Sequence, residues 1–214
     1  MPKVPCPLCA NPATEPFHRD NRRDYQHCRI CRLIFVPPNQ HLDQAEEKSI
    51  YDLHQNDSND PGYRRFLSRL ASPLLERLKP NSTGLDFGCG PGPLLAAMLR
   101  EAGHTVNLFD PYYANEPNHL HPGYDFITCT EVIEHLRQPR RELDTLLAML
   151  KPGGYLGLMT KLALDAQAFA KWHYKNDLTH IAFFSRPCLQ WYAAQNQCRI
   201  EFIGTDVIIL AKPD

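Results

Sequence analysis

The chain has 214 residues, with 23 Lys and Arg against 24 Asp and Glu, so its formal net charge is −1. Its 43% hydrophobic and 22% charged residues are typical of a globular protein and exclude disordered and fibrous classes. The longest apolar run, residues 94–99, is far shorter than the roughly 20 residues of a membrane span, and the first residues lack the apolar run of a secretory signal. We therefore expect a cytoplasmic protein without membrane association, and the near-zero charge predicts no general attraction to nucleic acid or anionic lipid.

Four of the eight cysteines form two pairs, Cys6-x-x-Cys9 and Cys28-x-x-Cys31. This spacing lets both thiolates of a pair face one ion, and two pairs complete a tetrahedral site with no open position for water. In a reducing compartment the pattern favours zinc over disulfides. We predict a structural Zn²⁺ on these four thiolates, within a zinc-ribbon-like module over residues 1–38.

The rest of this module leaves alternatives open. Residues 25–27 and 33–36 read as short strands beside the second cysteine pair. His18 and His27 are alternative ligands, and two unrelated thiol pairs are the alternative to a metal site. The module is also rich in arginine, which would suit RNA or an acidic substrate, although solvated loop charge explains it as well.

Residues 39–80 are expected to form a linker and a helical N-terminal extension. Residues 46–53 look helical, and apolar side chains recur at three- and four-residue spacing over residues 63–78. That spacing predicts an amphipathic helix with a kink at Pro73. A polar group between the two helices either lines the mouth of a site or satisfies the backbone of a turn: Tyr51, His54 and Asn56.

A short strand, a glycine-rich turn and a helix follow, the opening elements of a nucleotide-binding βαβ unit. The turn reads Asp86-x-Gly88-x-Gly90-x-Gly92. Glycines let a backbone approach a ligand where a Cβ would collide. The next predicted strand ends on Asp110, whose carboxylate is placed to accept both hydroxyls of a ribose.

The glycine spacing distinguishes between two cofactors. A Gly-x-Gly-x-x-Gly dinucleotide loop would have its third glycine where this chain has Pro93. Asp86 would repel a pyrophosphate but attract the sulfonium and ammonium groups of S-adenosylmethionine. The loop therefore favours S-adenosylmethionine over NAD, and a nicotinamide-dependent oxidoreductase is the weaker alternative.

With these motifs the chain resembles the class I S-adenosylmethionine-dependent methyltransferases over about residues 50–214. Further segments resemble the family's fourth strand and following helix, its fifth strand with the preceding helix, and its closing antiparallel strand pair: residues 124–136, 146–160, and 198–204 with 206–211. The resemblance implies an α/β, Rossmann-like sheet with helices on both faces, in a cofactor-binding domain over residues 81–214.

The resemblance also implies cofactor-binding residues at the ends of three strands: Asp86, Gly88, Cys89, Gly90, Gly92, Asp110, Thr130 and Glu131. There is one departure from the family pattern. Residues 111–123 are too few for the usual helix and third strand, so that strand is expected to be short or missing. The acidic residue that follows it in the family has no counterpart here, and Tyr112 or Tyr113 would contact adenine instead.

Glu131, Glu134 and His135 stand at i, i+3 and i+4 of a predicted helix and would share one face. With His180 they form a candidate site for Mg²⁺ or another divalent cation. A similar set occurs in the metal-dependent RNA 3′-end 2′-O-methyltransferases and, in part, in the ubiquinone-pathway O-methyltransferases, where the cation would orient a substrate hydroxyl and lower its pKa. The alternatives are catalysis by His135, His180 and Glu131 without a metal, and a structural role, since glutamates complement a helix N-terminus.

The predicted function is methyl transfer from S-adenosylmethionine to an unidentified acceptor, with O-methylation of a small molecule or RNA favoured. No Asn-Pro-Pro-Tyr or Asp-Pro-Pro-Tyr tetrapeptide follows the fourth strand, which argues against the amino-methylating type. Residues 172–176 either shape a substrate pocket or pack as a lid. The alternative function is a catalytically inactive scaffold with a zinc ribbon, against which the presence of both Asp86 and Asp110 speaks.

Overall fold

A computed structural model of the protein describes residues 4–53 and 60–214, so His54 and Asn56 lie outside the described residues. Its strands are β1 (Thr14–Arg19), β2 (Asp24–Cys28), β3 (Ile34–Phe35), β4 (Thr83–Phe87), β5 (Thr105–Phe109), β6 (Tyr124–Thr130), β7 (Leu150–Met159), β8 (Ala182–Phe183), β9 (Arg199–Ile203) and β10 (Val207–Ala211). Its helices are α1 (Gln44–Tyr51), α2 (Pro61–Leu75), α3 (Leu94–Glu101), α4 (Pro139–Met149), α5 (Ala166–Lys171) and α6 (Arg186–Gln195). Short 3₁₀ turns are η1 (Pro38–Gln40), η2 (Pro117–His119), η3 (Ile133–His135) and η4 (His173–Asn176).

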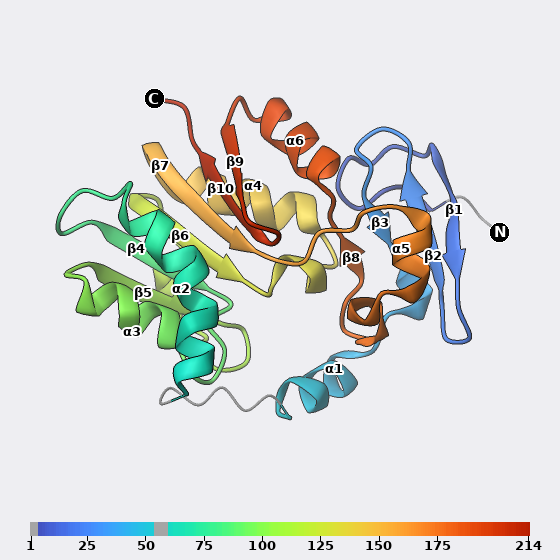
Figure 1. Ribbon diagram of the computed structural model, residues 1–214, viewed down its shortest axis with the longest axis horizontal. Coiled ribbons are helices and arrows are strands. Elements are labelled where there is room, and N and C mark those ends of the chain that lie inside the picture. The colour runs from blue at the N-terminus through green and yellow to red at the C-terminus, as the bar shows by residue number, and fades with distance from the viewer. Residues whose placement is uncertain (1–3, 54–59) are drawn as a thin grey trace.

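The larger sheet has six strands in the order β5-β4-β6-β7-β10-β9 (Figure 1). β5, β4, β6 and β7 run parallel, and β10 and β9 close the sheet as the predicted antiparallel pair. Between β5 and β6 the chain forms only a bridge from Asp110 to Ala114 and the turn η2. The prediction of a Rossmann-like sheet whose third strand is short or missing is therefore confirmed.

Helices cover both faces of this sheet because its central strands are apolar on both sides. In β10, Val207 and Ile209 face α2 and α3, whereas Ile208 and Leu210 face α4 and α6. The α2 side is filled by Leu67, Leu70, Leu74, Leu94, Leu95 and Leu99, and the α4 side by Leu143, Leu146, Leu147, Leu189 and Tyr192. Two apolar layers thus hold the strand ends that carry the predicted site.

Helix starts follow local capping chemistry. α1 begins at a capping box in which Asp43 accepts from the backbone of Glu46 and the Glu46 side chain accepts from Asp43. α2 begins with Pro61 in its first turn and includes Pro73. The helix predicted over residues 63–78 is therefore confirmed, although it starts and ends earlier in the chain than predicted.

No helix within the described ranges is long and apolar enough to cross a membrane.

The N-terminal module forms a second sheet, β1-β2-β3-β8, which lies beside the main sheet (Figure 1). The predicted strands at residues 25–27 and 33–36 are confirmed as β2 and β3. β8 comes from a distant part of the chain: Ile34 pairs with Phe183 and Phe35 with Ala182. The module therefore shares hydrogen bonds with the segment that follows α5.

Candidate active site and cysteine cluster

The loop after β4 has a backbone conformation that excludes side chains. Gly88 and Gly90 have φ angles of +73° and +63°, a conformation that costs a residue with a Cβ about 1–2 kcal/mol of conformational energy. A Cβ on Gly88 would also lie 2.3 Å from Cγ2 of Val132. At these glycines the loop thus presents backbone without side chains, at the carboxyl ends of the parallel strands and beside the switch point between β4 and β6 where ligands bind in such sheets.

Asp110 follows β5 directly and is hydrogen-bonded to this loop. Its Oδ2 accepts from the Gly90 N–H at 3.0 Å. Its Oδ1 accepts from the N–H groups of Tyr112 and Tyr113 at 2.9 and 3.1 Å. The carboxylate, which is buried, is held by backbone from both sides and lies against the glycine loop.

Asp86 lies within β4 and is buried next to the first turn of α3. Thr128 Oγ1 donates to its Oδ1 at 2.7 Å, and the Ala96 N–H donates to the same carboxylate. Burial raises the pKa of Asp86 to about 6, although the Thr128 hydrogen bond and the charge of Arg100 oppose the shift. At pH 7 the group is therefore mostly ionised, and this negative charge favours a cationic ligand at the loop.

The chain leaves β6 through a strained residue. Glu131 has a φ angle of +52°, and its N–H donates to the Met159 carbonyl at 2.7 Å. Such conformations cost residues with side chains about 1–3 kcal/mol and cluster at functional sites. The hydroxyl of the preceding Thr130 is buried without a hydrogen-bond partner among the described residues. Both features suit a ligand-binding position at the end of β6.

The α-helix predicted to carry Glu131, Glu134 and His135 on one face is wrong. Only the 3₁₀ turn η3 forms there, and α4 begins at Pro139. Proline has no N–H and is accommodated in the first helical turn, so the helix begins at that residue instead of after β6. Glu131 consequently lies outside η3, with its Oε2 at 3.4 Å from Oη of Tyr174.

Glu134, His135 and His180 come together all the same. Each offers one ligand atom, and these atoms lie within 4.8 Å of one another; Glu131 is not part of this group. Glu134 is fully buried: its Oε1 accepts from Tyr174 Oη, and its Oε2 has no hydrogen-bond partner within the described chain. Burial, with the charge of Glu131 adding to it, raises the pKa of Glu134 to about 8.

Both imidazoles turn the same ring atom toward the backbone. His135 Nδ1 lies 3.1 Å from the Thr179 carbonyl oxygen, and His180 Nδ1 lies 2.7 Å from that of Tyr174. A carbonyl only accepts, so the Nδ1 atoms carry the protons. Metal-binding histidines typically show this carbonyl contact on the nitrogen that does not bind the ion. Nε2 of His180 lies 3.8 Å from Oδ2 of Asp177.

Tyr174 belongs to the segment predicted to shape a pocket or pack as a lid, but its contact with Glu134 was not predicted. Beside its bond to Glu134, its Oη lies 3.2 Å from Oγ1 of Thr160, at the end of β7. Within residues 172–176, Tyr174 and Lys175 are buried and the others are not. The segment thus combines a wall of the site with packing, and an aromatic residue in a polar stretch after the fifth strand was the available signal.

The aromatic residues that replace the third strand contact α1. The Tyr51 ring lies 5.8 Å from that of Tyr112 and 5.3 Å from that of His135. Tyr113 Oη donates to Asp52 at 2.8 Å. Of the two interpretations of the polar group in the connector, Tyr51 therefore fits the first, because it lies at the rim of the Glu134 cluster.

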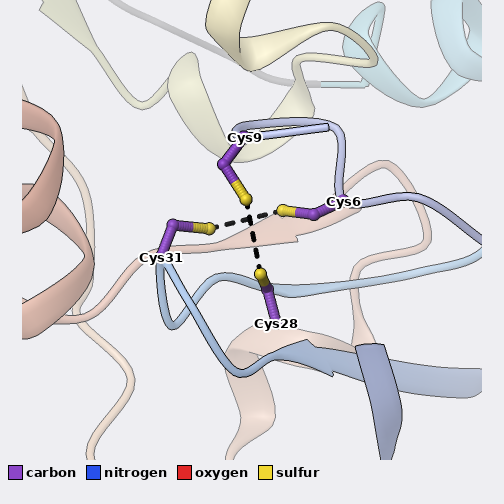
Figure 2. Close-up of side chains that lie close together, drawn as sticks. All are labelled: Cys6, Cys9, Cys28 and Cys31. Atoms are coloured by element: carbon purple, nitrogen blue, oxygen red, sulfur yellow. Dashed lines mark hydrogen bonds between the residues drawn. The ribbon is translucent and has the colours of Figure 1, made fainter. Parts of the chain in front are cut away.

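The four N-terminal cysteines converge (Figure 2). Sγ of Cys6 lies 3.3 Å from that of Cys31, Sγ of Cys9 lies 3.4 Å from that of Cys28, and all four sulfur atoms lie within 4.8 Å of one another. Tetrahedral Zn–S bonds of about 2.3 Å would put the sulfurs about 3.8 Å apart, so the cluster fits the ion. Its side chains also join the core on the α4 and α6 side of the main sheet.

Comparison with known proteins places this geometry in a family. The profile of the methyltransferase domain matches residues 60–201, well over half of the chain. A ubiquinone biosynthesis O-methyltransferase of Shewanella pealeana is 30% identical over 91 residues, which are 42% of this chain and 39% of that protein. The enzyme of the same name from Coxiella burnetii is 26% identical over 152 residues, 58% of this chain and 65% of that protein. The chain thus spans between about two fifths and two thirds of the length of these relatives.

A solved structure with a similar fold is the 1,6-didemethyltoxoflavin-N1-methyltransferase of Burkholderia thailandensis, with bound 1,6-didemethyltoxoflavin and S-adenosylhomocysteine. It is 17% identical, with a TM-score of 0.52, and the likeness covers 94% of this chain and 100% of that one. At this identity the likeness concerns the fold alone. Together, the family profile, the six-stranded sheet and the glycine loop at its carboxyl edge show that the chain belongs to the methyltransferase domain family of class I S-adenosylmethionine-dependent methyltransferases.

Proposed function

We propose that this protein transfers a methyl group from S-adenosylmethionine to a hydroxyl group of its acceptor. The observation that carries the choice of cofactor is the hydrogen bond from the Gly90 N–H to Asp110. It joins the glycine loop to the carboxylate that is suited to a ribose. Asp86, ionised beside the same loop, supports a cationic cofactor over a dinucleotide. The methionine half would lie along residues 88–92 and the ribose at Asp110.

S-adenosylmethionine, when bound, supplies a methyl group that is already activated. The chain therefore has to align the acceptor oxygen and exclude water from the site. Glu134 and His135 follow β6 in η3, and His180 lies just before β8. An imidazole that is not bound to a cation would receive the proton that the hydroxyl loses as the new C–O bond forms. Tyr174 would keep Glu134 in place through its hydroxyl.

A divalent cation on Glu134, His135 and His180 is part of the proposal. The buried Oε2 of Glu134 has no hydrogen-bond partner in the described ranges, and a cation would bind it as the carboxyl group loses its proton. Two imidazoles with one carboxylate suit Fe²⁺, Zn²⁺ or Mn²⁺ better than Mg²⁺, which prefers oxygen ligands. The cation would orient the acceptor hydroxyl and lower its pKa.

The acceptor class is proposed from chemistry and from the relatives. Imidazoles suit proton removal from a hydroxyl, and the Shewanella and Coxiella relatives are named as O-methyltransferases. A small molecule with a hydroxyl group is thus the favoured acceptor, and an RNA hydroxyl is the second possibility. We further propose that Cys6, Cys9, Cys28 and Cys31 hold a structural Zn²⁺.

Isothermal calorimetry with S-adenosylmethionine tests the core of the proposal. Saturable binding to the wild type that is weakened by Asp110→Ala is the expected result. Absence of binding at millimolar cofactor would overturn it and favour the inactive scaffold, and tight binding of NAD instead would favour an oxidoreductase. Incubating the methyl-labelled cofactor with pooled small-molecule extracts and, separately, with total RNA then distinguishes the two acceptor classes.

A further inference from the structure

Arg23 is a buried cation of the N-terminal module that reaches into the segment after α5. It is 5% exposed, and its Nη2 donates to the carbonyls of Lys175 and Asp177, both at 2.7 Å. Its Nη1 donates to the Leu178 carbonyl at 2.9 Å, and its Nε donates to Tyr25 Oη at 3.2 Å. One guanidinium thus holds three carbonyls of a single turn.

The turn that Arg23 holds also orients the imidazoles of the candidate site. The Tyr174 carbonyl accepts from His180 Nδ1, and the Thr179 carbonyl accepts from His135 Nδ1. Each of these two carbonyls belongs to a residue directly next to one whose carbonyl Arg23 binds. The guanidinium therefore fixes the turn between the two peptide groups that set the histidine orientation.

Only arginine suits this position. Its planar fork donates in several fixed directions at once, whereas the ammonium of lysine is a compact point charge on a flexible stem. Hydrogen bonds from a charged donor are also stronger than neutral ones. A carboxylate lies nearby in Asp20, whose Oδ2 accepts from Tyr25 Oη at 2.9 Å and pairs with Nζ of Lys175 at 3.2 Å.

Desolvating a guanidinium is costly unless its donors are satisfied, so the contacts of Arg23 require the turn and the module to stay together. The neighbouring Arg22 offers a contrast, because it makes one exposed hydrogen bond to the Asn176 carbonyl at 3.1 Å. The same turn is therefore touched by one buried, multiply bonded arginine and one exposed, singly bonded arginine.

We propose that Arg23 is a positioning residue through which the N-terminal cysteine module holds the His135 and His180 rings with their Nδ1 atoms against the carbonyls of Thr179 and Tyr174. The use of these rings in methyl transfer rests on the proposed function. The orientation itself does not, and it is measurable without cofactor, acceptor or added divalent cation.

The test is long-range ¹H–¹⁵N NMR of ¹⁵N-histidine-labelled protein that carries one Zn²⁺ per chain and receives no further metal, at a pH above the usual histidine range. The two rings are assigned from single histidine substitutions. In the wild type, His135 and His180 should be Nδ1–H tautomers, the minor form of imidazole in water. Arg23→Gln should shift both rings toward Nε2–H, Arg23→Lys should shift them partly, and Arg22→Gln, the matched control, should leave them unchanged.

Three results would each overturn the proposal. The first is that Arg23→Gln keeps the wild-type tautomers, the second is that Arg22→Gln shifts them equally, and the third is that the wild type itself has Nε2–H rings. If Arg23→Gln does not fold, Arg23→Lys tests the proposal instead. Unchanged tautomers in that variant would contradict a requirement for the planar guanidinium. Mn²⁺ titration followed by electron paramagnetic resonance gives a second readout, with affinity about 10- to 100-fold weaker in Arg23→Gln. Failure of the wild type to bind Mn²⁺ would remove the cation from the proposed function, while the tautomers would still decide the role of Arg23.

Discussion

Oδ2 of Asp110 lies 3.0 Å from the backbone nitrogen of Gly90, so one hydrogen bond joins the end of β5 to the glycine loop after β4. Asp110→Ala should therefore both lose the proposed ribose contact and loosen the loop. We expect S-adenosylmethionine binding to weaken by about 1–3 kcal/mol, the cost of an unsatisfied buried hydrogen-bonding group, measured by calorimetry.

Asp125→Ala is the matched control for this variant. Asp125 also accepts from a backbone N–H, that of Thr83 at 2.8 Å, but at the opposite ends of the strands. Its loss should lower the melting temperature without changing cofactor affinity. Equal affinity losses in the two variants would contradict a local role for Asp110.

Cofactor affinity should depend on pH through Asp86. Because the pKa of Asp86 is raised to about 6 by burial, its carboxylate is ionised above this value and neutral below it. Attraction to a cationic cofactor is thus present at pH 7 and lost as the pH falls through about 6. Thr128→Val removes a hydrogen bond to the ionised form, so the midpoint should move to higher pH. A smaller change with S-adenosylhomocysteine, which lacks the sulfonium charge, is the control, and pH-independent binding of both would exclude this role.

Gly88→Ala and Gly103→Ala separate backbone strain from collision. Both glycines have positive φ angles, but an added Cβ meets nothing within 4 Å at Gly103 and meets Val132 at 2.3 Å at Gly88. Gly103→Ala should cost about 1–2 kcal/mol of stability by chemical denaturation and leave cofactor binding unchanged. Gly88→Ala should cost more and abolish binding, and normal binding by it would show that the loop tolerates displacement.

Binding of Mn²⁺ at the Glu134 cluster should strengthen as the pH rises toward 8. The pKa of Glu134 is raised to about 8 by burial, and the ion binds the ionised carboxylate, so binding at pH 7 must release a proton. Calorimetry in buffers of different ionisation enthalpy measures that proton. Glu134→Gln should abolish binding and Glu142→Gln on α4 should not, whereas binding without proton release would rule out Glu134 as a ligand.

Purified protein should contain one Zn²⁺ per chain by elemental analysis. Cys28→Ser should lose the ion and much of the stability, because a structural zinc contributes folding free energy directly. Cys198→Ser, outside the cluster, should keep it. An absence of zinc in wild-type protein purified without chelators would leave the cysteines as a packed thiol cluster.

The sequence predicted those parts of the fold that depend on local patterns. Glycine spacing placed the loop, paired cysteines predicted the cluster, and the short interval before Tyr124 predicted the lost strand. Those signals reflect chemistry within a few residues of each other. The helix predicted after β6 was wrong although its signal was also local, because Pro139, four residues after His135, stands at the start of α4.

Long-range contacts were beyond such reasoning. Nothing near Arg23 in the sequence indicates that its partners are carbonyls of residues 175–178, and nothing near Tyr174 indicates Glu134. The two-residue strand β8 is also too short to have a pattern, and it exists because β3 supplies its hydrogen bonds.

The pairing of β3 with β8 bears on how this protein can be divided. A truncated version starting at residue 39 would strip β8 of its partner strand and uncover Phe183, which packs against Tyr25 in the intact chain. Removing the cysteine-bearing portion should therefore yield an aggregating fragment, not a smaller enzyme. By the same reasoning, exchanging that portion between relatives would succeed only if β8 and the residues that pack against it were exchanged together with it.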